Sequence, residues 1–433
     1  MTLRRWIAIL GIAMLLCGLM PARAEAYGVL AHEAIIDASW DTGIKPLLLK
    51  RFPDATADDL RHAHAYAYGG AVIQDLGYYP HGSHLFSDLV HYVRSGDFIT
   101  AMLRDSADLN EYAFALGALA HYSADNEGHR IAVNRAVPIL YPDLRKKYGD
   151  WVTYAENPFA HLKTEFGFDV LEVARQNYAP DSYRDFIGFE VSKPLLQRAF
   201  LETYCVPLNT IFGDFDRSVN SYRYDVSKII PTATRVAWQL KKSDIQKESP
   251  TMTRQRFLYH MSRAGYEKEW GHTYDPPGLG TKIVALIIRI VPKWGPLKAL
   301  QFKTPTPYTE NMFMASFNAA MDSYGRELDT IPKGGPNLPN TNFDTGGPVQ
   351  PGAYTLADVA YADLLNYLQK DQFKAITPDL RENILRYYSD TNLAFATKKH
   401  PKEWARVVRD LNEMKTAPDA QPGQVAESSL PSF

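Results

Sequence analysis

Apolar residues recur every three or four positions through most of the chain, and no long stretch alternates apolar and polar residues as a strand does. The clearest helical segment contains ALGALAHYSADNEGHR and has an apolar stripe along one face, formed by Leu109, Tyr112, Leu116 and Leu119. Asp108 followed by Glu111 is a capping-box pattern, which predicts that the helix begins there. The pattern predicts an all-α protein.

The same spacing predicts further helices on both sides of this segment. They are expected at 32–49, 60–75, 161–177, 192–212, 356–370 and 378–398. A polar stretch at 241–250 suggests a domain boundary, and the Gly/Pro-rich residues 331–353 suggest a long loop. We therefore expect one domain at 27–245, a mostly helical extension at 246–415 and a disordered tail at 416–433.

The first 26 residues have the pattern of a secretory signal peptide. Basic MTLRR precedes the apolar run WIAILGIAMLLCGLM, which is too short and wrongly flanked for a stable membrane span. Small residues allow cleavage after Ala24 or after Ala26, so the mature chain would begin at Glu25 or at Tyr27. The protein is expected to be exported, to the periplasm or beyond. Cys205 would then be the only cysteine, and no internal disulfide could form.

Charge and hydropathy indicate which partners to expect. The formal net charge of -2 gives no sign of a polyanion-binding surface, so no stable nucleic-acid partner is expected. The apolar segment IVALIIRIV at 283–291 is flanked by lysines, and residues 283–298 are compatible with peripheral contact with a membrane or with a buried core helix. Arg289 and Pro292 argue against a membrane span.

Histidines and carboxylates are spaced as metal ligands. His121, Asp125 and His129 recur every fourth residue, so their side chains share one face of a helix. The same step joins His161 to Glu165. Zinc prefers imidazole nitrogen and carboxylate oxygen, and the supply of both here exceeds the needs of one ion. For a single triplet of this kind, a plain polar surface is the alternative.

Taken in order, these motifs resemble the zinc-dependent phospholipase C family, to which the secreted single-strand zinc nucleases are related. The resemblance covers roughly residues 27–245. The stretch from Tyr27 to His32 is similar to the mature start of those enzymes, where the first residue binds metal through its amino group and carbonyl. The spacing from Asp125 to His129 is similar to that of glycosylphosphatidylinositol-specific phospholipase D. The resemblance implies a helical bundle, here with a helical C-terminal extension.

The resemblance also implies three zinc ions and a set of ligands for each. The first ion would take Asp75, His84, His121 and Asp125; the second would share Asp125 and add Tyr27 and His32; the third would take His129, His161 and Glu165. His91 is a rival to His84 for the first ion.

A zinc site of this kind implies phosphodiester hydrolysis, because neighbouring zinc ions can hold phosphate oxygens and activate water. Asp75 is the expected catalytic residue, which would orient or deprotonate the attacking water. The leading prediction is an exported phospholipase C that cleaves a phospholipid head-group phosphodiester. The alternatives are a single-strand nuclease or another phosphodiesterase, phospholipase D-like cleavage included, and a non-catalytic zinc-stabilised module that binds lipid or a partner.

Overall fold

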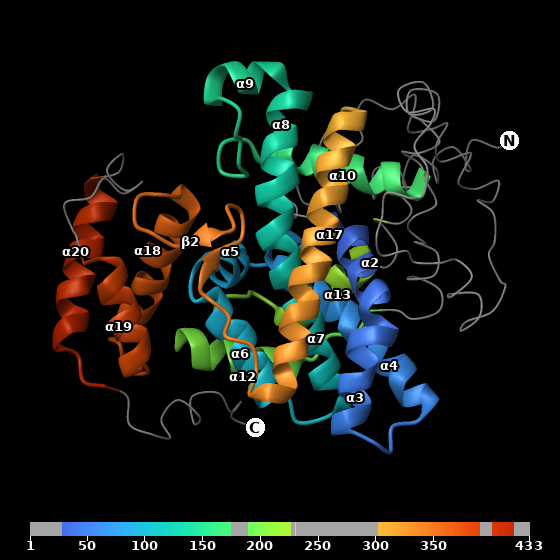
Figure 1. The fold of residues 1–433 in the computed structure, drawn as a ribbon. Coiled ribbons are helices and arrows are strands. Elements are labelled where there is room, and N and C mark those ends of the chain that lie inside the picture. Colours follow the sequence, from blue (N-terminus) through green and yellow to red (C-terminus); the bar gives the residue numbers. More distant parts are fainter. Residues whose placement is uncertain (1–27, 175–188, 227–229, 231–301, 390–400, 420–433) are drawn as a thin grey trace, which may run out of the picture.

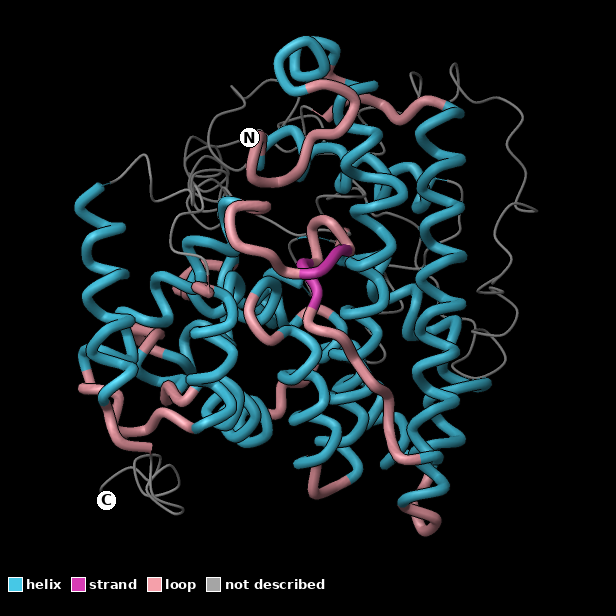
Figure 2. Tube along the Cα trace, turned by 60° about the vertical axis from the view of Figure 1, so that its left-hand side comes forward, coloured by secondary structure: helices cyan, strands magenta, loops and turns pink. Residues whose placement is uncertain are grey.

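The computed structural model describes residues 28–174, 189–226, 230, 302–389 and 401–419, and helices dominate them (Figure 1). The strands within these ranges are β1 (Thr341–Asn342) and β2 (Gly347–Pro348), which pair antiparallel. Figure 2 shows this small hairpin surrounded by helices. The prediction of an all-α protein is confirmed. None of the helices in the described ranges is long and apolar enough to cross a membrane.

The N-terminal part of the described chain contains the elements that carry the predicted ligands. Its helices are α2 (Val29–Ser39), α3 (Lys45–Arg51), α4 (Ala57–Ala71), α5 (His84–Tyr92), α6 (Ser95–Asp105), α7 (Leu109–Gly128), α8 (Asn134–Leu140), α9 (Pro142–Tyr148), α10 (Pro158–Ala174), α12 (Lys193–Tyr204) and α13 (Phe215–Tyr224). Short turns join some of these helices. Two are π-helical, η1 (Trp40–Ile44) and η3 (His129–Val133), and two are 3-10 helical, η2 (Ile73–Tyr78) and η5 (Leu208–Thr210).

The C-terminal part consists of α17 (Pro307–Thr330), η9 (Ile331–Lys333), the hairpin, α18 (Thr355–Lys370), α19 (Pro378–Tyr387) and α20 (Pro401–Thr416). Helix α17 packs against α7, and α18 packs against α5. One buried apolar cluster extends from Val29 to Met414. The boundary predicted at 241–250 lies outside the described residues, and this core contains residues from both sides of it.

Helix α7 occupies the middle of the molecule, with α4 and α17 packed along it (Figure 1). It begins as predicted, because the Asp108 side chain accepts a hydrogen bond from the backbone N–H of Glu111 at 2.8 Å. The Glu111 carboxylate accepts from the N–H of Ala107. A Cβ on Gly117 would lie 2.1 Å from the Ala67 carbonyl oxygen of α4. Glycine therefore permits the close approach that brings the end of α4 beside the ligand face of α7.

Several predicted helices differ from the observed ones. The helix predicted at 32–49 is divided into α2 and α3 by the π-helical turn η1, and the predicted loop at 331–353 contains the hairpin. Helices α17 and α20 were not individually predicted. The signal peptide, Tyr27, residues 283–298 and residues 420–433 of the tail lie outside the described residues.

Candidate metal centre

Three groups of buried histidine and carboxylate side chains converge in the region between α2, α4, α5, α7 and α10. Within each group, one potential ligand atom per residue lies within 4.8 Å of the others. The groups are His32, His121 and Asp125; Asp75, His91 and His121; and His129, His161 and Glu165. The first two groups share His121 and so form one connected site, and the third group has no residue in common with them.

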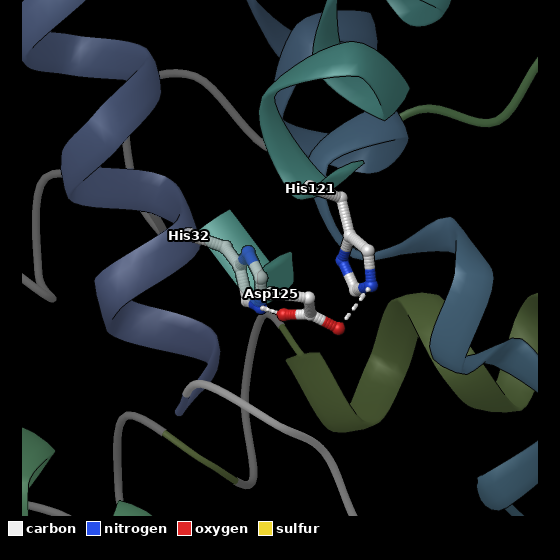
Figure 3. Close-up of side chains that lie close together, drawn as sticks. All are labelled: His32, His121 and Asp125. Carbon is white, nitrogen blue, oxygen red and sulfur yellow. Dashed lines mark ion pairs between the residues drawn. The ribbon is translucent and has the colours of Figure 1, made fainter. Parts of the chain in front are cut away.

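Asp125 lies between two sets of histidines. Its Oδ1 is 3.5 Å from Nε2 of His32, and its Oδ2 is 3.0 Å from Nε2 of His121 (Figure 3). Helix α2 supplies His32, and α7 supplies the other two residues one helical step apart. A carboxylate whose two oxygens face different ligand groups can bridge two cations.

Asp75 and His91 complete the neighbouring group. Asp75 lies in η2, directly after α4, and its Oδ1 is 3.4 Å from Nε2 of His91. The same His91 nitrogen is 3.5 Å from Oδ2 of Asp125. These distances place His91 within reach of both carboxylates.

The structure brings His91, and not His84, into this centre. Both residues belong to α5, seven positions apart, and such a spacing separates them by about 10 Å along the helix axis. His84 is exposed at the start of the helix, where its ring lies beside Tyr78 with centroids 5.8 Å apart. His91 is 2% exposed.

The rings of His91 and His121 are oriented by the main chain. Nδ1 of His91 lies 2.7 Å from the Ser87 carbonyl oxygen, and Nδ1 of His121 lies 2.9 Å from that of Ala71. A carbonyl can only accept, so each Nδ1 carries the proton and donates. Nε2 of each ring is thereby left as the ligand atom, which is the usual arrangement for metal-binding histidines.

The third group lies at the other end of the same ligand face. His161 and Glu165 are one helical step apart in α10, with Nε2 of His161 2.9 Å from Oε1 of Glu165. His129 begins the π-helical turn η3, and its ring centroid is 4.9 Å from that of His161. The structure thus brings together the three residues that the sequence analysis grouped for a third ion.

Burial and neighbouring charges set the protonation states of these residues. Burial lowers the pKa of His32, His129 and His161, which favours neutral, ligand-competent imidazoles. Burial also opposes charge on His91, but the carboxylates of Asp125 and Asp75 outweigh it and raise the pKa of His91 to about 10. Burial disfavours the Asp125 carboxylate, yet His121 and His91 hold its pKa well below the usual range. The two carboxylates therefore attract a positive charge.

The buried polar atoms of this centre fit a bound cation. Both carboxylate oxygens of Asp75 and of Asp125, and both ring nitrogens of His129 and of His161, make no hydrogen bond within the described part of the chain. Such atoms are costly to bury unless something binds them. Imidazole nitrogen and carboxylate oxygen form a donor set that suits zinc.

One charged residue of the centre was missed by the sequence analysis. Asp344, in the turn between β1 and β2, is buried, and its Oδ1 lies 3.4 Å from Nδ1 of His129. It falls in the Gly/Pro-rich segment at no fixed spacing from the proposed ligands, so no local pattern pointed to it. Tyr27, predicted to bind through its terminal amine, lies outside the described residues.

Comparison with known proteins agrees with this centre. The family model described as zinc dependent phospholipase C matches residues 30–213. That range contains every member of the three groups, from His32 to Glu165. Neither a search of curated proteins nor a search of solved structures found a match. Residues 30–213 of the chain are therefore similar to the zinc-dependent phospholipase C family.

Proposed function

We propose that the protein is a zinc-dependent phosphoric diester hydrolase, and specifically a phospholipase C that cleaves a phospholipid head-group phosphodiester. The observation that carries the proposal is the position of Asp125, whose two oxygens face His32 on one side and His121 and His91 on the other. Two cations bridged by one carboxylate would lie close enough to contact the same phosphate. The match of the family model supports the same reaction class.

The proposed ligand sets follow the observed groups. Asp75, His91, His121 and Asp125 would hold the first ion; Asp125 and His32, with the amino terminus of Tyr27 if cleavage follows Ala26, the second; His129, His161 and Glu165 the third. When bound, zinc would supply Lewis-acid polarisation of the phosphate and would lower the pKa of a water molecule. His91 replaces His84 in this assignment because of its distances to both carboxylates.

Asp75 is the residue we propose to orient or deprotonate the attacking water. Its carboxylate is fully buried and makes no hydrogen bond within the described residues. Nε2 of His91 lies 3.4 Å from Oδ1 of Asp75, and Nδ1 of His121 lies 3.9 Å from Oδ2. Because His121 Nδ1 already donates to the Ala71 carbonyl, Oδ2 remains available to accept a proton.

Export and membrane contact form the rest of the proposal. The N-terminal 26 residues would direct the chain to the periplasm or out of the cell, and their removal would create the Tyr27 terminus. Residues 283–298 would help the enzyme meet a lipid surface through their apolar and lysine side chains.

The test uses mature protein purified from the exported fraction, with its N-terminus sequenced and its zinc measured. Phospholipid vesicles and single-stranded DNA are then offered separately. We expect three zinc ions per chain and release of diacylglycerol with a phosphorylated head group. Phosphatidate would indicate phospholipase D-like cleavage, and nucleotides would indicate a nuclease. Tightly bound zinc without turnover on any phosphodiester would contradict an enzymatic role and favour a zinc-stabilised binding module.

A further inference from the structure

The turn between β1 and β2 places a carboxylate against the third ligand group. Oδ2 of Asp344 accepts hydrogen bonds from the hydroxyls of Tyr92, at 2.8 Å, and of Tyr354. With Oδ2 occupied by two donors, Oδ1 is left to face Nδ1 of His129 at 3.4 Å. The Asp344 carboxylate is thus held on one side and directed at a proposed zinc ligand on the other.

Several contacts hold this turn in place. The backbone N–H of Phe343 donates to the His91 carbonyl at 3.3 Å, and the Asn134 side chain donates to the Asp344 carbonyl. Gly346 has a φ of +65°, and a Cβ there would lie 2.4 Å from the Asn126 carbonyl oxygen of α7. Only glycine combines this left-handed conformation with so close an approach. The turn is therefore docked firmly on the helix that bears the ligands.

The neighbouring Phe343 contacts the other side of the centre. Its ring is edge-on to that of His91, with centroids 5.2 Å apart, and its centroid lies 6.1 Å from that of His121. Phe343, Asp344 and Tyr354 all lie beyond residues 30–213, the range of the family model. A segment outside that range thus contributes side chains to the wall of the centre.

We propose that Asp344 is a positioning residue for the third zinc ion. Its Oδ1, 3.4 Å from Nδ1 of His129, would accept the Nδ1–H when the ring binds the metal, and would so direct Nε2 to the ion. Asp344 is not a member of the ligand group of His129, His161 and Glu165, whose atoms all lie within 4.8 Å of one another. A carboxylate behind a metal-binding histidine fixes its tautomer and orientation and raises its basicity. The C-terminal part of the chain then completes the metal centre of the N-terminal part.

This inference rests on the zinc binding of the proposed function, but not on which phosphodiester is cleaved. The test is Asp344→Asn in the full mature chain, with zinc affinities measured by competition against a chromophoric chelator. We expect one of the three ions to bind about 10- to 100-fold more weakly and the other two to be unchanged. Asp371→Asn, an exposed aspartate in the turn after α18, is the matched control and should leave all three affinities unchanged.

A second variant and a second measurement separate positioning from a structural role. Tyr354→Phe removes one donor to Asp344, so it should weaken the same ion by less than about tenfold. The melting temperatures of the metal-free proteins report on the fold alone. Unchanged zinc affinities in Asp344→Asn, or an equal loss at all three ions, would overturn the proposal. Three ions in the wild type without phosphodiester turnover would instead contradict the proposed function and leave this inference standing.

Discussion

The Nε2 atoms of His91 and His121 face each other at 3.4 Å. Both rings donate through Nδ1 to main-chain carbonyls, so both Nε2 atoms present lone pairs towards the same space. Asp75 and Asp125 direct carboxylate oxygens to that space as well. Two lone pairs and two carboxylates repel one another unless a positive charge lies among them. In the absence of metal a proton on His91 serves this purpose, since its pKa is raised to about 10.

This relationship predicts which histidine of α5 binds zinc. His91→Ala should lower the zinc content by at least one ion per chain and abolish turnover. The substitution removes a proposed zinc ligand that lies within 3.5 Å of both carboxylates, those of Asp75 and Asp125. His84→Ala is the matched control on the same helix and should keep the full zinc content. Elemental analysis of the two dialysed proteins decides between them. Zinc loss in His84→Ala alone would show that the assignment is reversed.

Asp75→Asn separates proton transfer from metal binding. The amide keeps the shape and an oxygen ligand but cannot take a proton, so turnover should fall about 10²- to 10⁴-fold. Zinc content should fall far less than turnover. Both are measured on the same preparation, with Asp371→Asn as the control. Proportional losses of zinc and turnover would count against a role for Asp75 beyond ligation.

Removal of zinc should destabilise the fold. The centre buries the carboxylates of Asp75 and Asp125 among histidines, and without a bound cation the proton on His91 offsets only one of their two negative charges. A site occupied at a thousandfold excess of zinc over its dissociation constant stabilises by about 4 kcal/mol. We therefore expect chelator to lower the melting temperature by several degrees or more. Zinc should restore it, and calcium, which prefers oxygen ligands, should not. An unchanged melting temperature after full zinc removal would contradict this prediction.

Asp169 predicts a pH dependence of stability. Its Oδ2 accepts from the N–H of Leu30 at the start of α2, 3.2 Å away. Burial raises the pKa of Asp169 to about 8, although the backbone N–H groups of Leu30 and Ala31 act in the opposite direction. The pKa of Asp169 in the folded state lies above its unfolded value of about 4, so the folded state keeps this proton up to a higher pH than the unfolded state does. The free energy of unfolding should therefore fall as pH rises from about 4 to about 8.

Asp169→Asn tests this prediction, because the amide stays uncharged over the whole range. The variant should gain stability relative to the wild type as pH rises through that window, up to a few kcal/mol, since one pKa unit corresponds to about 1.4 kcal/mol. Urea unfolding of both zinc-saturated proteins between about pH 5 and 9 measures the difference. Parallel stability curves would show that Asp169 does not ionise in this range.

Much of the local structure could be predicted because it depends on residues close in sequence. The start of α7 follows from Asp108, whose side chain bonds a backbone N–H three residues on. The division of the first predicted helix at η1 was missed, as was the π-helical turn that begins at His129. Both π-helical turns shift the helix register within a single turn. The spacing of apolar residues, which is read over several turns, does not show so local a change.

The helical fold and the spacing of ligands within one helix could be read from local sequence alone. His121 and Asp125 in α7, and His161 and Glu165 in α10, must share a face because the helix repeats every 3.6 residues. How the helices meet depends on tertiary packing. Tertiary packing brings His91, and not His84, beside the carboxylates, and it places His32 at one oxygen of Asp125 and His91 at the other. It also places Asp344 beside His129, from which it is 215 residues distant in the chain. These contacts depend on long-range packing, which leaves no periodic trace in the sequence.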